Sequence, residues 1–232
     1  MKGLSLALFL STMICDVAAF AAEDEDSADG LPAKYAKDYL IASNTISPER
    51  EFAVMYPANE PKLSDSDYVV ALKPFAVLTK LATDRPYFRN ENHGSLKATW
   101  SGDSSAVLIT LGIKWGPGDV FLVELKNGKA ARTTNLLAKV RAALLPDYRK
   151  AKAGKYNDTY DFVFEEADNN GFEFGGAGHV CINVFATTDP KGVSNSVWEG
   201  RFTGAWDIGH AKFTSAKVTR EFAGTREHKP ED

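Results

Sequence analysis

Residues 96–134 hold the strongest constraint on the fold of this chain. Apolar runs rich in β-branched residues, at 106–113 and 120–125, lie between shorter extended segments at 97–100 and 130–134. Clusters of Gly, Pro, Asn and Ser separate the runs, and the runs are short, which is typical of strands rather than helices. We therefore expect an antiparallel meander. The nearly unbroken apolar run 106–113 predicts a strand that is buried on both faces.

The turns of this meander have specific chemistry. Asn127-Gly128 supplies two residues that tolerate positive φ, as a type I′ turn requires, so it predicts a hairpin between 120–125 and 130–134. Ser101-Gly102-Asp103-Ser104 is a second turn cluster. Trp115-Gly116-Pro117-Gly118 predicts an interruption of the sheet, because proline has no backbone donor.

The rest of the chain also reads as strands, with one exception. Apolar residues spaced for one side of a helix predict an amphipathic helix over 135–152, with Asn135 among its candidate caps and Pro146 expected to break or kink it. We expect a mainly β protein, an antiparallel meander that is either blade-like or a two-sheet sandwich, with this helix packed on it. The other predicted strands are 52–56, 68–72, 75–81, 160–165, 171–174, 178–187, 199–206 and 213–222.

The N-terminus has the pattern of an export signal. Lys2 precedes an apolar stretch, and Ala19-Phe20-Ala21 fits a cleavage site, so we expect residues 1–21 to be a signal peptide. Residues 22–37 are predicted to be an acidic flexible lead, 38–222 a single β-rich domain and 223–232 a polar tail. The predicted location is outside the cytoplasm, either periplasmic or secreted.

Charge and cysteine content limit the partners. The formal net charge is −4, with no basic cluster, which argues against nucleic acid. No apolar run after residue 21 reaches the roughly 18 residues of a membrane span, so the chain is not expected to span a membrane. Of the two cysteines only Cys181 lies beyond the predicted signal, so no internal disulfide is expected.

One segment repeats another at a distance of 54 residues. Residues 46–54 align without gaps on 100–108, each reading as a large apolar residue, Ser, a turn residue, an acid, two polar residues and an apolar run. This pattern resembles the W-S-P-D-G turn of WD40-like propeller blades of the TolB type. The resemblance covers residues 45–57 and 96–134, and it implies blade-like sheets. Two similar hairpins in one sheet remain the alternative, since a closed propeller needs four or more blades.

Catalytic motifs are weak. His179 and Cys181 lie two apart on a predicted strand, about 7 Å from each other, which is too far for a thiol–imidazole hydrogen bond. We therefore expect a half-buried structural cysteine. The four histidines show no metal-ligand spacing and the glycine-rich segments open no helix, so neither a metal site nor a cofactor is predicted.

Ligand-binding candidates come from aromatic residues and a polar loop. Trp115 and Trp198 flank turns and are predicted to be exposed, where indole faces can stack on sugar rings. His93, in the long polar loop 84–95, joins them as a third candidate. Trp100 and Trp206 lie in alternating strands and are predicted to be core residues.

Two functions follow from these patterns. The first is an exported, non-catalytic β-domain that binds a protein or a cell-envelope component such as a glycan. The alternative is a cell-envelope hydrolase, which would use Cys181 with His179 or a carboxylate pair drawn from Asp103, Asp119 and Asp207. A binding domain needs an accessible surface or hollow, whereas a hydrolase needs reactive groups that converge in one cleft.

Overall fold

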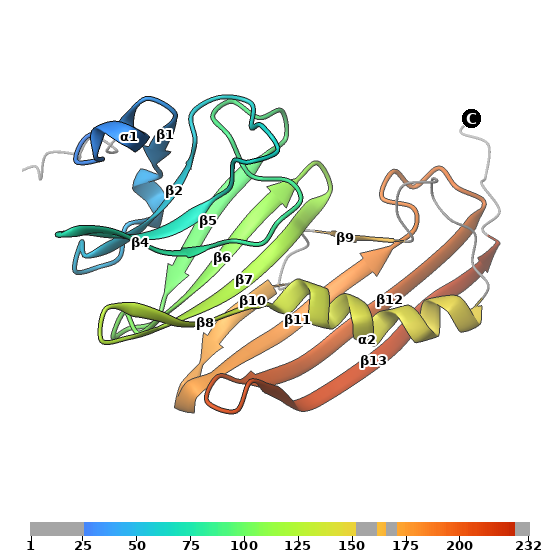
Figure 1. Cartoon of the computed structure of the whole chain (residues 1–232). Coiled ribbons are helices and arrows are strands. Elements are labelled where there is room, and N and C mark those ends of the chain that lie inside the picture. Colours follow the sequence, from blue (N-terminus) through green and yellow to red (C-terminus); the bar gives the residue numbers. More distant parts are fainter. Residues whose placement is uncertain (1–25, 152–161, 166–170, 226–232) are drawn as a thin grey trace, which may run out of the picture.

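A computed structural model of the chain describes residues 26–151, 162–165 and 171–225 (Figure 1). The predicted fold class is confirmed, because the described chain forms antiparallel sheets with one long helix packed against them. There are three sheets rather than the one or two that the sequence suggested. We call them the N-terminal, central and C-terminal sheets.

The N-terminal and central sheets each have four strands in chain order. The N-terminal sheet consists of β1 (Tyr39–Ile41), β2 (Phe52–Pro57), β3 (Tyr68–Leu72) and β4 (Phe75–Lys80). The central sheet consists of β5 (Ser95–Trp100), β6 (Ala106–Ile113), β7 (Gly116–Lys126) and β8 (Lys129–Asn135). Short helical segments, α1 (Ala33–Ala36) and η1 (Ser43–Thr45), flank β1.

The C-terminal sheet is built around the long strands β11 (His179–Thr187) and β12 (Ser196–Asp207). Its order is β10-β11-β12-β13, and β9 pairs with the far end of β11. The remaining elements are β9 (Val163–Glu165), β10 (Gly171–Gly175), the 3-10 turn η2 (Gly176–Gly178), β13 (Lys212–Thr225) and the helix α2 (Leu136–Ala151). β13 extends three residues into the predicted polar tail, because it pairs with β12 as far as Ser196.

The predicted meander is present in the central sheet. Asn127 and Gly128 have φ values of 52° and 69°, as the predicted hairpin turn requires. Pro117 does not interrupt the sheet, so that prediction was wrong. It lies inside β7 opposite Gly112, next to a register shift between Leu111 and Gly112. Such an irregularity admits proline because the regular hydrogen-bond pattern is already broken there.

The segments that resemble each other form the same turn. Ser47 donates its backbone N–H to the Phe52 carbonyl, and Ser101 donates to Ala106, both at 2.8 Å. In return, each serine hydroxyl accepts the N–H of the same partner, at 3.1 Å for Phe52 and 2.9 Å for Ala106. The serine therefore closes both turns in the same way.

The fourth residue of each turn completes the match. Arg50 and Ser104 have φ values of 54° and 53°, and each donates its backbone N–H to the carbonyl of the serine three positions earlier. Thr79 of β4 and Thr133 of β8, also 54 residues apart, touch through their hydroxyls at 3.2 Å. The N-terminal and central sheets are thus blade-like meanders, and each contains its own copy of this serine turn.

The central sheet is the middle layer, as its apolar run predicted. Alternate residues of β6 and β7 face opposite ways, which follows from the two-residue period of a strand. One set packs with the N-terminal sheet: Val107, Ile109, Leu111, Phe121 and Val123. The other set packs with α2 and the C-terminal sheet: Ala106, Leu108, Val120 and Leu122.

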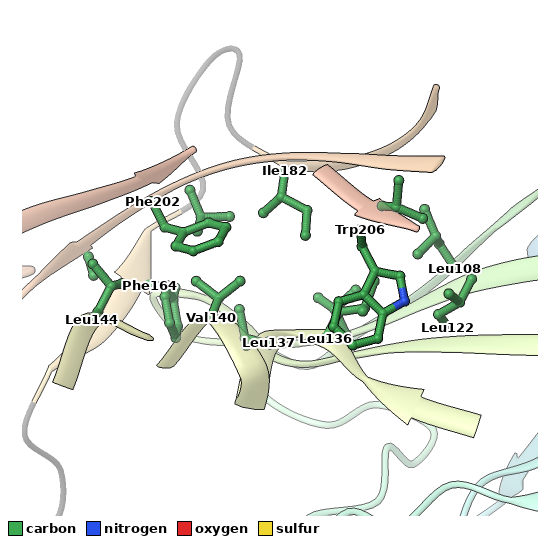
Figure 2. Close-up of a cluster of buried hydrophobic side chains, with 14 of the residues drawn as sticks. Leu108, Leu122, Leu136, Leu137, Val140, Leu144, Phe164, Ile182, Phe202 and Trp206 are labelled. Carbon is green, nitrogen blue, oxygen red and sulfur yellow. The ribbon is translucent and has the colours of Figure 1, made fainter. Parts of the chain in front are cut away.

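The helix fills the space between the central and C-terminal sheets. Figure 1 shows α2 lying across the C-terminal sheet, and Figure 2 shows Val140 and Leu144 of α2 pointing toward Ile182 and Phe202 of that sheet. Leu108 and Leu122 of the central sheet close the other side of this cluster, with Trp206, a core residue as predicted. Burial of this stripe stabilises the helix more than its intrinsic propensity does.

Pro146 was expected to break or kink the helix, and the expectation of a break was wrong. The helix continues to Ala151 because its last turns are anchored after the proline. Tyr148 is buried, and the Asp147 carboxylate accepts hydrogen bonds from the indole of Trp198 at 3.2 Å and the guanidinium of Arg220 at 2.8 Å. These contacts offset the hydrogen bond that proline removes.

The described part of the predicted flexible lead, residues 26–37, is attached to the N-terminal sheet. Ser27 forms a β-bridge with Ile41. The Asp26 carboxylate accepts the Tyr56 hydroxyl and, at 2.8 Å, the Ser43 backbone N–H. A buried hydroxyl needs an acceptor, and Asp26 supplies one, so this acid has a structural role that composition does not reveal.

Candidate functional site

A polar hollow lies at one end of the central sheet. It forms where β6 ends, β7 begins and β8 meets α2, and the loop of residues 81–94 covers it. Its volume is about 370 Å³, which is within the range of small-molecule sites. Thr83, Asp84, Arg85, Glu91, Asp119 and Asn135 supply its polar lining. We call this cavity the polar hollow and the segment the 81–94 loop.

Asp119 is the most firmly held acid of the hollow. Its carboxylate accepts the Thr83 hydroxyl at 2.7 Å and the Asn135 side-chain amide at 2.6 Å. Asn135 is the last residue of β8, and its side-chain oxygen accepts the Ala138 N–H at 2.9 Å, as a helix N-cap does. The strand, the helix start and the loop therefore fix this carboxylate together.

Glu91 and Arg85 form an ion pair on the covering loop. The guanidinium of Arg85 lies 3.3 Å from the Glu91 carboxylate. Burial raises the pKa of Glu91, and Arg85 opposes this rise. The Arg85 side chain is 69% exposed, so its guanidinium remains accessible to a ligand in the hollow.

Asp67 lies next to the hollow and is fully buried. One carboxylate oxygen accepts the Tyr87 N–H at 3.0 Å, and the other has no hydrogen-bond partner within the described chain. The pKa of Asp67 is raised to about 7, mainly by burial; the hydrogen bond from the Tyr87 N–H opposes this rise, and the charges of Glu91 and Asp119 contribute to it. A carboxyl with so strongly shifted a pKa beside a cavity is typical of functional sites.

Two of the three predicted ligand-binding residues lie at this end of the sheet. Trp115 occupies the turn between β6 and β7, half-buried, with the Lys114 ammonium 4.7 Å over its ring. His93 is exposed near the end of the 81–94 loop, with a φ of 63°. It precedes Ser95, which pairs with Gly112 of the hollow.

Trp198 lies elsewhere and corrects the expectation that it is exposed. Its side chain is fully buried in the core around α2, with its ring 5.4 Å from Tyr148 and 5.0 Å from Phe162. Its position beside a turn suggested exposure, but the helix covers it. An indole without exposed surface presents no face to a ligand. Trp100, predicted to be core, is only half-buried and stacks on Phe52.

Cys181 and His179 line different hollows. Cys181 is exposed, not half-buried as predicted, because the outer face of the C-terminal sheet has no covering layer within the described chain. It lines a hollow there with Glu173 and Asn183. His179 lines a hollow between the central and C-terminal sheets. The pair is not brought together.

The three acids from which a carboxylate pair was predicted also have different roles. Asp103 accepts the Ser105 hydroxyl at 2.7 Å, the Ser105 N–H at 3.0 Å and the Ser101 hydroxyl at 2.8 Å, and these turn contacts lower its pKa to about 2. Asp207 accepts the His210 N–H at 2.9 Å, which lowers its pKa. Both carboxylates stabilise turns, whereas Asp119 lines the polar hollow.

Sequence reasoning missed Asp67, Glu91 and Arg85. The only signal was the length of the polar loop that carries two of them, since long loops without secondary structure are often functional. No group of His, Cys, Asp or Glu in the described residues has the arrangement to hold a metal ion. Within the same residues, no helix is both long and apolar enough to cross a membrane.

Comparison with protein-family models, curated proteins and solved structures finds no match for this chain.

Proposed function

We propose that this chain is an exported, non-catalytic β-domain that binds a cell-envelope glycan in the polar hollow. The observation that carries the proposal is the Asp119 carboxylate, fixed by Thr83 and Asn135 in a cavity of about 370 Å³. Preorganised polar groups of this kind supply the orientation and specificity of a small-ligand site.

The chemistry of the hollow suits a ligand rich in hydroxyl groups. The carboxylates of Asp119 and Glu91 accept hydrogen bonds, and the guanidinium of Arg85 donates them. Sugar hydroxyls do both, so neighbouring hydroxyls can pair with a carboxylate and a guanidinium at once. Trp115, in the adjacent turn, adds an aromatic ring of the type that sugar rings stack on.

A small polar ligand is favoured over a protein surface. The large apolar side chains that are exposed in the described residues lie on separate elements: Leu63, Val77, Val193 and Val218. Protein-binding surfaces usually present a contiguous apolar patch, and scattered single residues do not form one. A concave polar cavity is therefore the stronger candidate.

The proposal includes an exported location and a resemblance to WD40-like blades. The signal-peptide pattern of residues 1–21 supports a periplasmic or secreted location, where a glycan ligand is available. The shared serine turns at Ser47 and Ser101 support the resemblance to WD40-like blades of the TolB type. In this interpretation the two blade-like sheets are the scaffold of the binding site.

A hydrolase at the same site is the second candidate. The shifted pKa of Asp67, beside the carboxylate of Asp119, is typical of an acid and base pair in glycoside hydrolysis. Against it, Asp67 has no exposed surface, and a general acid must reach the leaving-group oxygen. This burial favours binding over catalysis.

The test is a binding measurement with matched variants. Calorimetric titration with solubilised envelope glycan fragments is expected to show saturable binding, weakened about tenfold or more in Arg85→Ala because an accessible charged donor is lost. Arg201→Ala is the control, since Arg201 forms an ion pair with Glu221 on the C-terminal sheet, away from the hollow. New reducing ends in the titrated mixture would favour the hydrolase. Absence of binding, or equal loss in both variants, would overturn the proposal.

A further inference from the structure

We propose that ionisation of the buried Asp67 carboxyl group shifts the 81–94 loop from a closed form over the polar hollow toward an open form, so that the loop opens more often as the pH rises. The effect on ligand affinity rests on the proposed function. The behaviour of the loop does not, because it follows from contacts within the protein.

Asp67 is tied to the loop at two points. Its backbone carbonyl accepts the Leu81 N–H at 2.9 Å, and its carboxylate accepts the Tyr87 N–H at 3.0 Å. Leu81 is fully buried, whereas the Tyr87 ring is half-buried and packs 5.0 Å from Tyr56. The side-chain contact thus holds the middle of the loop, and the backbone contact holds its start.

The loop has few other supports in the described chain. Thr83 reaches Asp119, and the Arg89 guanidinium donates to the Asp26 carbonyl at 2.9 Å. Asn90 and His93 both have a φ of 63°, a region that non-glycine residues occupy at some cost. Of the loop residues only Leu81 and Tyr87 contribute to the described hydrophobic clusters, and a segment with so few apolar contacts and such backbone strain opens at low free-energy cost.

The charge around Asp67 makes its ionisation unfavourable in the closed form. Glu91 on the loop and Asp119 on β7 are the charged groups that face it, and both are acids. Arg85 is the nearby cation, and it is paired with Glu91. A negative charge on Asp67 would therefore be buried beside two others, and one of its oxygens has no hydrogen-bond partner among the described residues.

A second buried carboxylate, Asp189, has the pair of hydrogen-bond donors that Asp67 lacks within the described residues. Asp189 is 6% exposed, but its two oxygens accept the backbone N–H groups of Val193 and Ser194, each at 3.0 Å. Fully hydrogen-bonded carboxylates tolerate burial in the charged form. Within the described chain Asp67 has no such second donor, so its ionisation favours an open loop that lets water reach the carboxylate.

The sign and size of the effect follow from linkage. The pKa of Asp67 is about 7 in the closed form and returns toward 3.8 when water reaches the carboxyl. Opening therefore releases a proton and is favoured as the pH rises between these values. From pH 5 to pH 8 the opening equilibrium constant is expected to rise roughly 80-fold.

Hydrogen exchange of the unliganded full chain tests this directly. Protection factors of the 81–94 amides, corrected for the intrinsic pH dependence of exchange, are measured from pH 5 to pH 8. In the wild type they should fall roughly 80-fold over this range. In Asp67→Asn, which keeps an acceptor for Tyr87 but cannot ionise, they should stay constant. Asp65→Asn, at a half-buried neighbour whose carboxylate accepts the Lys62 N–H, should behave like the wild type.

Each outcome separates this inference from the proposed function. If the protection of the loop amides does not change with pH in either the wild type or Asp67→Asn, the inference is overturned, whether or not glycan binds. A pH-dependent loop without any glycan binding would support the inference and refute the proposed function. A pH dependence that survives in Asp67→Asn would assign the effect to another group and overturn the role of Asp67.

Discussion

Asn135 joins three parts of the molecule, so its replacement gives a sharp prediction. The residue ends β8, caps α2 through the Ala138 N–H and donates to the Asp119 carboxylate at 2.6 Å. Loss of an N-cap costs about 1 kcal/mol, and loss of a hydrogen bond to a charged acceptor costs about 2 kcal/mol. Asn135→Ala should therefore lower the free energy of unfolding by about 3 kcal/mol, which corresponds to roughly 6–12 °C in melting temperature.

Asn135→Ser divides this loss into its two parts. Serine caps a helix as well as asparagine does, but its short side chain does not replace the amide donor to Asp119. In urea unfolding, Asn135→Ser should lower the free energy of unfolding by about 2 kcal/mol. Asn92→Ala, which removes an exposed side chain, should lower it by less than about 0.5 kcal/mol. Equal losses of unfolding free energy for Asn135→Ala and Asn135→Ser would refute the role of Asn135 as a helix cap. A loss below about 1 kcal/mol for Asn135→Ala would refute the coupling of the hollow to the helix.

Three further predictions follow from burial and charge. Trp198→Ala should lower the unfolding free energy by about 3–5 kcal/mol, because the indole is fully buried, and a loss near that of Trp115→Ala would contradict this. In a Cys15→Ser background, the exposed Cys181 thiol should react with a thiol reagent as fast in the folded chain as in urea; reaction only on unfolding would disprove its exposure. The pKa of Asp67 is raised on folding to about 7, so its stabilising protonation is lost as the pH rises from 4 to 7. Over that range the wild type should lose about 3 kcal/mol of stability relative to Asp67→Asn, and parallel curves would rule this out.

Local sequence patterns predicted the parts of the fold that local chemistry determines. The apolar run at β6 is buried on both faces, and Asn127-Gly128 forms the expected turn. The serine turns at Ser47 and Ser101 share their hydrogen bonds, as their sequence similarity indicated. In each case the deciding interactions lie within a few residues of one another.

The two prolines were misjudged because tertiary contacts outweigh local preference. Pro117 is tolerated at a register shift that depends on how β6 and β7 align. Pro146 is tolerated because Trp198 and Arg220, both distant in sequence, hold Asp147 just after it. Neither partner can be identified from the residues around the proline.

The candidate site could be predicted only in part. The sequence pointed to Asp119 as one of three acids, and to Trp115 and His93 at what proves to be the same end of the central sheet. Asp67 follows polar residues, a pattern that indicates solvent exposure, and its burial arises from the 81–94 loop folding over it. Such burial depends on contacts between distant segments, so no local pattern reveals it.

Glycan binding in the polar hollow is tested by mapping which backbone amides respond to the glycan. Two-dimensional amide NMR spectra, recorded while envelope glycan fragments are added to the isotope-labelled chain, report each backbone N–H. If glycan binds in the polar hollow, the amides of Thr83, Gly112 and Gly118, which line it, shift and saturate together. Shifts confined to the outer face of the C-terminal sheet, around Cys181 and Lys217, would contradict it.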